Sequence, residues 1–159
     1  MILYMKQHIF TWGDKFSIYD EAGNEQYYVE GEVLTWGKKL HLYDLNRREI
    51  AFIRQRLLTL PPKYEILQND QIVAELAKKF TFFRHEYKVN GPDWKGYGDY
   101  TGHDYEITEN DRCVAHISRA WFTLGDAYRI DIDDSVDEVL TLAVVLGIDA
   151  AIEAERNSH

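Results

Sequence analysis

Apolar and polar side chains alternate in short runs along most of this chain, from Ile2 to Ile132. An alternation with a period of two places every second side chain on the same face, which is the pattern of a half-buried β-strand. Glycine, asparagine and aspartate separate the runs, as they do at turns. The runs number about eleven to thirteen and no helical period interrupts them, which indicates an all-β body.

The second half of this β region contains an internal repeat. Residues 64–89 align without a gap to residues 105–130, with eight of the 26 positions identical. Each copy has an Asn-Asp pair between two alternating runs, and this pair tolerates the positive φ of a tight turn, so each copy predicts β-hairpins. Cys113 stands at the position of Ile72, which favours a small apolar core residue over a nucleophile.

A second internal sequence similarity links the two ends of the β region. The sequence FTWGDKFSI at residues 10–18 matches FTLGDAYRI at residues 122–130. Each contains a Gly-Asp pair, and glycine suits a two-residue hairpin turn. We therefore predict turns at Gly13-Asp14 and at Gly125-Asp126.

The pattern changes near the C-terminus, where residues 139–152 read VLTLAVVLGIDAAI. Ser135 and Glu138 have the spacing of a capping box, which predicts a helix over about residues 136–155. The helix is apolar on every side, with Thr141 as the one polar side chain before Ile148, so it requires apolar surroundings on every side. Fourteen helical residues span about 21 Å, less than the ~30 Å hydrocarbon core of a bilayer, and no transmembrane segment is expected.

Many antiparallel strands followed by such a helix predict a mainly β fold: a closed antiparallel β-barrel of about twelve strands enclosing the hydrophobic C-terminal helix. The alternative is a β-sandwich with the helix packed on one side, which requires a polar stripe along the helix. In the glycine-rich stretch NGPDWKGYGDYTG, we predict turns at Gly91-Pro92 and Gly98-Asp99. Aromatic side chains of this stretch are expected to close one end of the barrel; they are Trp94, Tyr97 and Tyr100.

Composition and charge narrow the class of protein. We expect a single domain over residues 1–159, a size that allows a substantial core. Cys113 is the only cysteine, and the opening MILYMKQHIF is too short and too polar for a signal peptide, so a cytoplasmic location is expected. The net charge of −9 argues against nucleic acid as a partner.

The charge is unevenly distributed along the chain. Residues 47–95 carry a net charge of +4, between segments of −3 and −10. Arg54 and Arg56 alternate onto one face of the predicted strand AFIRQRLL, and Lys78 and Lys79 follow in the next hairpin region. Arginine can grip a phosphate with two hydrogen bonds, so these four residues are the candidate site for an anion or a lipid head group. One alternative is a solvated strand surface balanced by nearby acidic side chains. Another is that the two arginines serve the barrel by pairing with interior acids such as Asp149.

Other chemistry is not indicated. The six histidines and one cysteine show no metal-ligand spacing, so no metal or cofactor is expected. His103 lies beside an aspartate, and for it we favour a turn leading into a strand over acid–base chemistry. For His41 we predict a half-buried position in a strand. Asp131, Asp133 and Ser135 have the spacing of a calcium loop, but its glycine and its glutamate are missing. We therefore predict no catalytic residues and no enzyme activity.

Four longer phrases carry a resemblance to a known family: GEVLTWGKKLHLYD, IAFIRQRLLTLPPKYEI, GDYTGHDYEI and DIDDSVDEVLTLAVVLGIDAAI. Together, between Lys6 and Ile152, they resemble bacterial members of the LURP-one-related family, part of the tubby C-terminal-like superfamily that includes the phospholipid scramblases. The resemblance implies a closed barrel of about twelve strands threaded by a hydrophobic helix. It brings no catalytic residues, and a shared fold does not establish a shared function.

The functional expectation is therefore a non-enzymatic binding module, with anionic phospholipid head groups at the membrane surface or a protein as partner. The alternative is a structural or regulatory scaffold that contacts another protein and binds no lipid. A contiguous basic groove would favour the lipid, whereas scattered charge would favour the scaffold.

Overall fold

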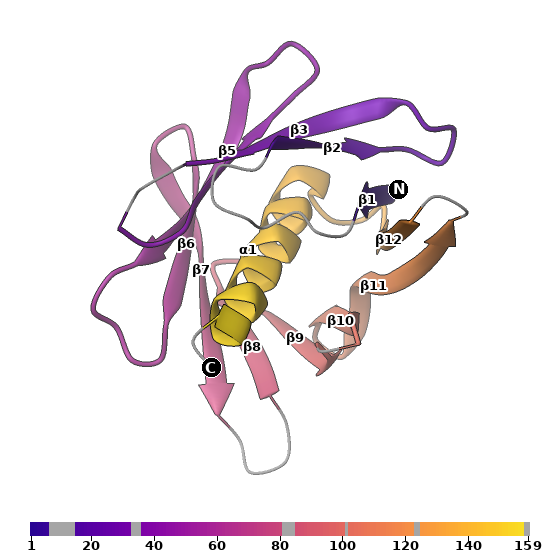
Figure 1. Cartoon of the computed structure of the whole chain (residues 1–159). Helices are drawn as coiled ribbons and strands as arrows, with labels where there is room; N and C mark the ends of the chain where they lie inside the picture. Colours follow the sequence, from indigo (N-terminus) through magenta and orange to yellow (C-terminus); the bar gives the residue numbers. More distant parts are fainter. Residues whose placement is uncertain (7–14, 33–35, 81–84, 101, 123–124, 158–159) are drawn as a thin grey trace.

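The computed structural model describes residues 1–6, 15–32, 36–80, 85–100, 102–122 and 125–157 (Figure 1). In these ranges, twelve β-strands precede one α-helix, α1 (Glu138–Asn157). The strands are β1 (Ile2–Lys6), β2 (Lys15–Tyr19), β3 (Glu25–Gly31), β4 (Lys39–Tyr43), β5 (Glu49–Arg56), β6 (Lys63–Gln68), β7 (Gln71–Phe80), β8 (His85–Asn90), β9 (Trp94–Asp99), β10 (Asp104–Glu109), β11 (Arg112–Phe122) and β12 (Gly125–Ile132).

The strands form a closed antiparallel barrel in which each strand pairs with its neighbours in the sequence. The last strand closes on the first, with Leu3 of β1 opposite Ile130 of β12. Closure means that each described strand has a partner on both sides, so none of them is an edge strand open to pairing with another chain. The predicted barrel is confirmed, and the alternative β-sandwich is wrong.

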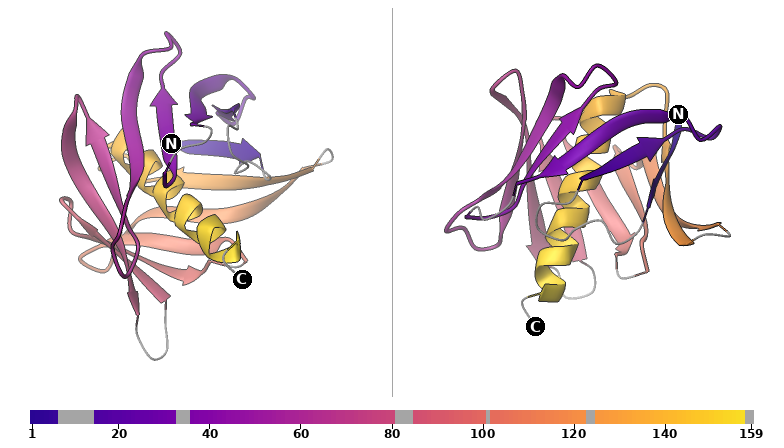
Figure 2. Two further views of the ribbon diagram at one scale, coloured as in Figure 1. Left: turned by 60° about the vertical axis from the view of Figure 1, so that its left-hand side comes forward. Right: turned by 45° about the horizontal axis from the view of Figure 1, so that its top comes forward.

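Helix α1 runs through the interior of the barrel, as two further views show (Figure 2). Every residue from Thr141 to Ile152 is buried, including Val144 and Leu146, which lie on different sides of the helix. The Thr141 hydroxyl donates a hydrogen bond to the Asp137 carbonyl, 2.6 Å away, so its polar group is satisfied within the helix. The barrel wall supplies the apolar surroundings that the sequence of the helix requires.

The start of α1 differs from the prediction. The helix begins at Glu138, and Asp137 caps it by accepting a 2.8 Å hydrogen bond from the Leu140 amide. The predicted capping box is wrong because both of its side chains have other partners. The Ser135 hydroxyl accepts from Arg112 at 2.8 Å, and the Glu138 carboxylate accepts from the Tyr27 hydroxyl at 2.5 Å.

Two turns of the repeat have the predicted geometry. Asn69 and Asp70 have φ angles of 50° and 61°, and Asn110 and Asp111 have φ angles of 48° and 65°. Positive φ at both central residues is typical of the primed turns that match the twist of the strands. Both Asn-Asp turns are therefore confirmed.

The prediction that Cys113 is a buried core residue is wrong. Cys113 is exposed, and Ile72 at the equivalent position is 56% exposed. In each hairpin, the strand pairing skips the valine that directly follows this residue. In the first hairpin, Leu67 pairs with Ile72 but Ile66 pairs with Ala74, so the valine between Ile72 and Ala74 has no partner. This extra residue is a β-bulge that breaks the period of two, so Ile72 and Cys113 point outward while the following alanines point inward.

Several glycine predictions also change. Gly125 and Asp126 pair with β11, and Gly98 and Asp99 pair with β10, so both Gly-Asp pairs belong to strands and not to turns. At Gly98, a Cβ atom would lie 2.7 Å from the Tyr105 Cα atom, so close contact between strands explains this glycine. The Gly91-Pro92 turn is confirmed, and the predicted turn at Gly13-Asp14 lies outside the described residues.

The aromatic side chains of the glycine-rich stretch do not close one end of the barrel. Trp94 begins β9 and Tyr100 follows its end, so the two lie at opposite ends of this strand, and both are buried in the core. Tyr97 is half-buried, between the inward-facing Gly96 and the exposed Gly98. Tyr100 packs edge-on against Tyr87, with ring centroids 5.0 Å apart.

Candidate functional site

The connection between β5 and β6 exposes apolar side chains. Strand β5 ends at Arg56, earlier than the sequence predicts, and residues 57–62 read LLTLPP. Prolines lack the amide hydrogen that a strand ladder requires, so this apolar segment cannot continue the barrel wall. Leu58 is fully exposed and Leu60 is 98% exposed. A leucine pair this exposed on one loop has no role in the core.

Trp36 extends this apolar surface. Its side chain is 86% exposed, and the next residue, Gly37, lies against Leu57. We call residues 57–62 together with Trp36 the apolar rim. Pro62 lines the same pocket as Ala154 of α1, so the rim lies at the end of the barrel where α1 ends.

Basic side chains lie beside the rim on the outer face of the barrel. Arg54 lies 3.5 Å from Glu65, and Arg56 and Lys63 lie 3.5 Å and 3.6 Å from the two oxygens of Glu75. The two ion pairs with Glu75 are partly exposed and contribute only about 0–1 kcal/mol to stability, whereas the Glu65 partner of Arg54 is buried. The suggested pairing of Arg54 and Arg56 with Asp149 is wrong, because Asp149 is buried inside the barrel on α1, whereas both arginines lie on the outer face.

We call Lys39, Arg54, Arg56 and Lys63 the basic wall. In the strand register, Lys39 of β4 lies opposite Arg54 of β5, and Arg56 of β5 lies opposite Lys63 of β6. The four cations therefore occupy one surface. Two carboxylates, Glu65 and Glu75, lie among them. The wall therefore keeps an excess of positive charge in a chain whose net charge is −9.

The structure separates the other two residues of the candidate anion site. Lys78 points into the barrel, is buried, and lies 2.5 Å from the Glu155 carboxylate of α1. Lys79 points outward, opposite Glu86 of β8. Arg54, Arg56 and Lys79 of the four predicted residues therefore face the outside of the barrel, and Lys78 belongs to a different site inside it.

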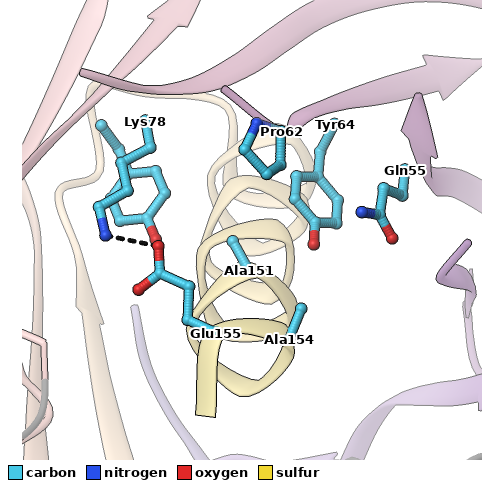
Figure 3. Close-up of a pocket in the computed structure, with 8 residues that line it drawn as sticks. Gln55, Pro62, Tyr64, Lys78, Ala151, Ala154 and Glu155 are labelled. Atoms are coloured by element: carbon cyan, nitrogen blue, oxygen red, sulfur yellow. Dashed lines mark hydrogen bonds and ion pairs between the residues drawn. The ribbon is translucent and has the colours of Figure 1, made fainter. Parts of the chain in front are cut away.

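This interior site is a pocket of about 230 Å³ between the C-terminal part of α1 and strands β5 to β8 (Figure 3). The Lys78–Glu155 pair forms one side of it. Its other lining is mostly apolar and consists of Gln55, Pro62, Tyr64, Tyr87, Ala151 and Ala154.

The tyrosines of the pocket remain protonated at neutral pH. Burial raises the pKa of both Tyr64 and Tyr87 well above the ordinary value, and the Glu155 carboxylate raises the pKa of each hydroxyl further. Both hydroxyls therefore lie within electrostatic range of the same carboxylate and can act as hydrogen-bond donors.

His103 lies in a second buried polar contact. Its Nδ1 atom is 3.7 Å from Asp149 Oδ1, and its ring packs on Tyr128 with centroids 4.5 Å apart. His103 has a φ of 54° directly before β10, so the predicted turn leading into a strand is confirmed. It does not line the pocket of Figure 3.

The other sequence candidates take part in local contacts. His41 is half-buried as predicted, with Nε2 3.2 Å from Glu32 and Nδ1 bonded to Glu49. Asp133 Oδ1 accepts a 2.8 Å hydrogen bond from the Ser135 amide. Within the described ranges, no group of three potential ligands could hold a metal ion, and no helix is long and apolar enough to cross a membrane.

The apolar rim was missed by the sequence analysis, which placed Leu57 and Leu58 at the end of a strand. The available signal was the two prolines directly after LLTL, because they exclude a regular strand and leave the leucines in a loop. The pocket had no comparable signal, since Lys78 and Glu155 are 77 residues apart.

Comparisons with known proteins agree with the fold. The sequence pattern of the family described as LURP-one-related matches residues 1–149. The uncharacterized protein YxjI of Bacillus subtilis (strain 168) is 30% identical over 150 residues, which cover 94% of this chain and 93% of that protein. An X-ray structure of a protein from Arabidopsis thaliana superimposes with a TM-score of 0.65 at 14% identity, covering 96% of this chain and 91% of the other. At that identity the likeness concerns the fold. Because the family pattern covers nearly the whole sequence, the chain belongs to the LURP-one-related family.

Proposed function

We propose that the protein is a non-enzymatic binding module that attaches peripherally to anionic membranes through the apolar rim. The basic wall faces the phospholipid head groups in this arrangement. The observation that carries the proposal is the full exposure of Leu58 and Leu60 on one loop beside Arg56 and Lys63. Apolar side chains flanked by cations are typical of surfaces that bind the interface of an anionic bilayer.

The energetics support such an attachment. Burying a leucine side chain that is otherwise in water stabilises by about 1.5–3 kcal/mol. A lysine or arginine close to an anionic membrane adds about 1 kcal/mol. Tryptophan favours the interfacial region, where its indole ring is partly buried and its N–H stays hydrated, which suits the exposed Trp36.

Sedimentation with vesicles tests the proposal. The protein is mixed at physiological salt with vesicles of phosphatidylcholine alone, or of phosphatidylcholine with phosphatidylserine. We expect binding to the anionic vesicles and much weaker binding to the neutral ones. Replacing Leu58 and Leu60 by serine should weaken binding to anionic vesicles by about tenfold or more, because two buried leucines are lost.

A matched control variant replaces Leu45 and Ile72 by serine. Both side chains are 56% exposed and lie next to turns at the opposite end of the barrel. This variant should bind like the wild type. If both pairs of substitutions weaken binding equally, the rim is not the attachment surface.

The contribution of the basic wall is tested separately with Arg54→Gln and Arg56→Gln together. The Arg56 ion pair is partly exposed, whereas the Glu65 partner of Arg54 is buried. Unfolding stability should therefore fall by no more than about 1–2 kcal/mol, while vesicle binding weakens and becomes less sensitive to salt. Unchanged binding would remove these arginines from the proposal. If the wild type binds neither kind of vesicle, lipid attachment is wrong, and the protein-binding scaffold becomes the preferred function.

A further inference from the structure

The pocket at the end of α1 contains a buried hydrogen-bond donor that has no internal acceptor. Tyr64 is 2% exposed, and its hydroxyl lies near Ala151 and Ala154 of the helix (Figure 3). Among the described residues, no atom forms a hydrogen bond with this hydroxyl. Burial raises the pKa of Tyr64, so the group stays protonated and can donate at any physiological pH. A buried donor without an acceptor costs stability, so this pocket suits a ligand that supplies one.

The charged groups of the pocket already neutralise one another. The Lys78 ammonium lies 2.5 Å from the Glu155 carboxylate. Figure 3 shows this pair across the pocket from the Tyr64 hydroxyl, so no single ligand group contacts both sides. An ionised group placed at Tyr64 would therefore be buried without a counter-charge, which is unfavourable in an apolar environment. The pocket thus favours a neutral ligand that leaves the ion pair in place.

The rest of the lining limits the size and the polarity of this ligand. Pro62, Ala151 and Ala154 are apolar, and Pro62 is exposed, so the pocket of about 230 Å³ can be entered from solvent. A cavity of about 150 Å³ holds benzene, so this one has room for about nine non-hydrogen atoms. An alcohol or an amine would bring a second donor into the apolar lining, whereas a carbonyl oxygen only accepts.

From these contacts we infer that the pocket binds a small, mainly apolar carbonyl compound without charge, such as a ketone or an ester. Its carbonyl oxygen accepts a hydrogen bond from the Tyr64 hydroxyl. Its apolar part packs on Pro62, Ala151 and Ala154. Pockets that are mostly apolar, with a few polar groups that fix orientation, are the usual form of small-molecule sites. The inference goes beyond membrane attachment and is tested without lipid bilayers.

Three probes of the same shape test the site. Acetophenone carries a carbonyl, cumene has a methyl group in place of the carbonyl oxygen, and benzoate has a charged carboxylate. Binding is followed by NMR through the methyl signal of Ala151, which lines the pocket. We expect saturable one-to-one binding of acetophenone and no measurable binding of benzoate, because its charge would be buried without a partner. No saturable binding of acetophenone, or equal binding of benzoate, would overturn the inference.

Tyr64→Phe tests the hydrogen bond to the carbonyl. It removes only the hydroxyl, so acetophenone should bind about three- to tenfold more weakly, whereas cumene should bind at least as tightly as to the wild type. The matched control is Tyr105→Phe. Tyr105 is buried, its hydroxyl also has no hydrogen bond to a described residue, and it does not line the pocket. This control should change neither affinity. If Tyr64→Phe weakens both probes equally, or neither of them, the carbonyl assignment is wrong.

Ala154→Leu tests the position of the site. The larger side chain fills the apolar part of the pocket and keeps helix propensity, so acetophenone and cumene should both lose binding. Glu153→Leu adds a leucine at a neighbouring, partly exposed position outside the pocket and should bind like the wild type. Circular dichroism confirms that each variant is folded. If Ala154→Leu fails to fold, Tyr64→Phe and its control decide. Acetophenone binding that survives in folded Ala154→Leu would contradict the assignment.

Discussion

Shortening one buried side chain on each of two opposite sides of helix α1 tests whether the barrel wall surrounds the helix. Val144 and Leu146 lie about 200° apart around the helix axis, and both side chains are completely buried. Leu146→Ala should cost about 2–5 kcal/mol of unfolding free energy, from lost apolar burial and the cavity that remains. Val144→Ala removes two methyl groups and should cost about 2 kcal/mol.

Charged substitutions at the same positions should be more severe. Val144→Asp or Leu146→Asp would place a carboxylate without a compensating partner in the apolar interior. The cost is comparable to the ~5–15 kcal/mol total stability of a typical domain, so each variant should fail to fold.

Urea unfolding followed by far-UV circular dichroism measures the alanine effects. Glu153→Ala, at a partly exposed position near the end of the helix, serves as the control and should change stability by no more than ~0.5 kcal/mol. If Val144→Ala behaves like this control while Leu146→Ala shows the full loss, one side of the helix is not packed against the wall. The barrel arrangement would then be refuted.

Three further predictions address the strands and turns. Gly98 has a φ of 143° and little space for a Cβ atom, so Gly98→Ala should lower the unfolding free energy, measured with urea, by about 3 kcal/mol or more. Gly23 has a φ of 83° and no atom within 4 Å of a Cβ position, so Gly23→Ala should lower it by about 1 kcal/mol. Cys113 is exposed, while partial burial of its sulfur and the Glu106 carboxylate raise the pKa of the thiol, so a maleimide should label the native protein, more slowly than a free cysteine peptide; labelling only after denaturation would contradict its exposure. A hydrogen bond from the backbone amide of residue 24, together with weaker hydrogen bonds, lowers the pKa of Asp20 below 3.8. The Asp20 carboxylate therefore stabilises the fold above pH 3.8, and this contribution is lost as the pH falls through the pKa of the folded state. The melting temperature of Asp20→Asn should therefore be lower than that of the wild type at pH 7, with the difference shrinking below pH 3.8.

Much of the architecture follows from local patterns in the sequence. The alternation of side chains specifies strands, and the paired Asn69-Asp70 and Asn110-Asp111 turns specify hairpins, because a positive φ at two consecutive residues is a local property of the backbone. The helix is also specified locally, and its lack of a polar face requires an enclosing wall. Barrel closure follows because neighbouring strands pair in sequence order and only the two end strands remain to be joined.

The tertiary structure decided which side chains face inward next to the hairpin turns. A single extra residue in β7 and in β11 reverses the phase of the alternation, and this turned Ile72 and Cys113 outward. Periodicity in the sequence cannot reveal a bulge, because the bulge exists only in the pairing with a second strand.

The candidate sites show the same division. Arg54 and Arg56 share a face because they alternate within one strand, so their common surface could be predicted from the sequence. Lys78 and Lys79 are neighbours in the sequence, yet β7 places them on opposite sides of the wall for the same geometric reason. The pocket depends on Lys78 meeting Glu155, 77 residues later, through the packing of α1 inside the barrel. Local patterns determine which residues form a strand and which of them share a face. The closed wall around the helix decides which distant side chains meet, because only the packed barrel brings them within contact distance.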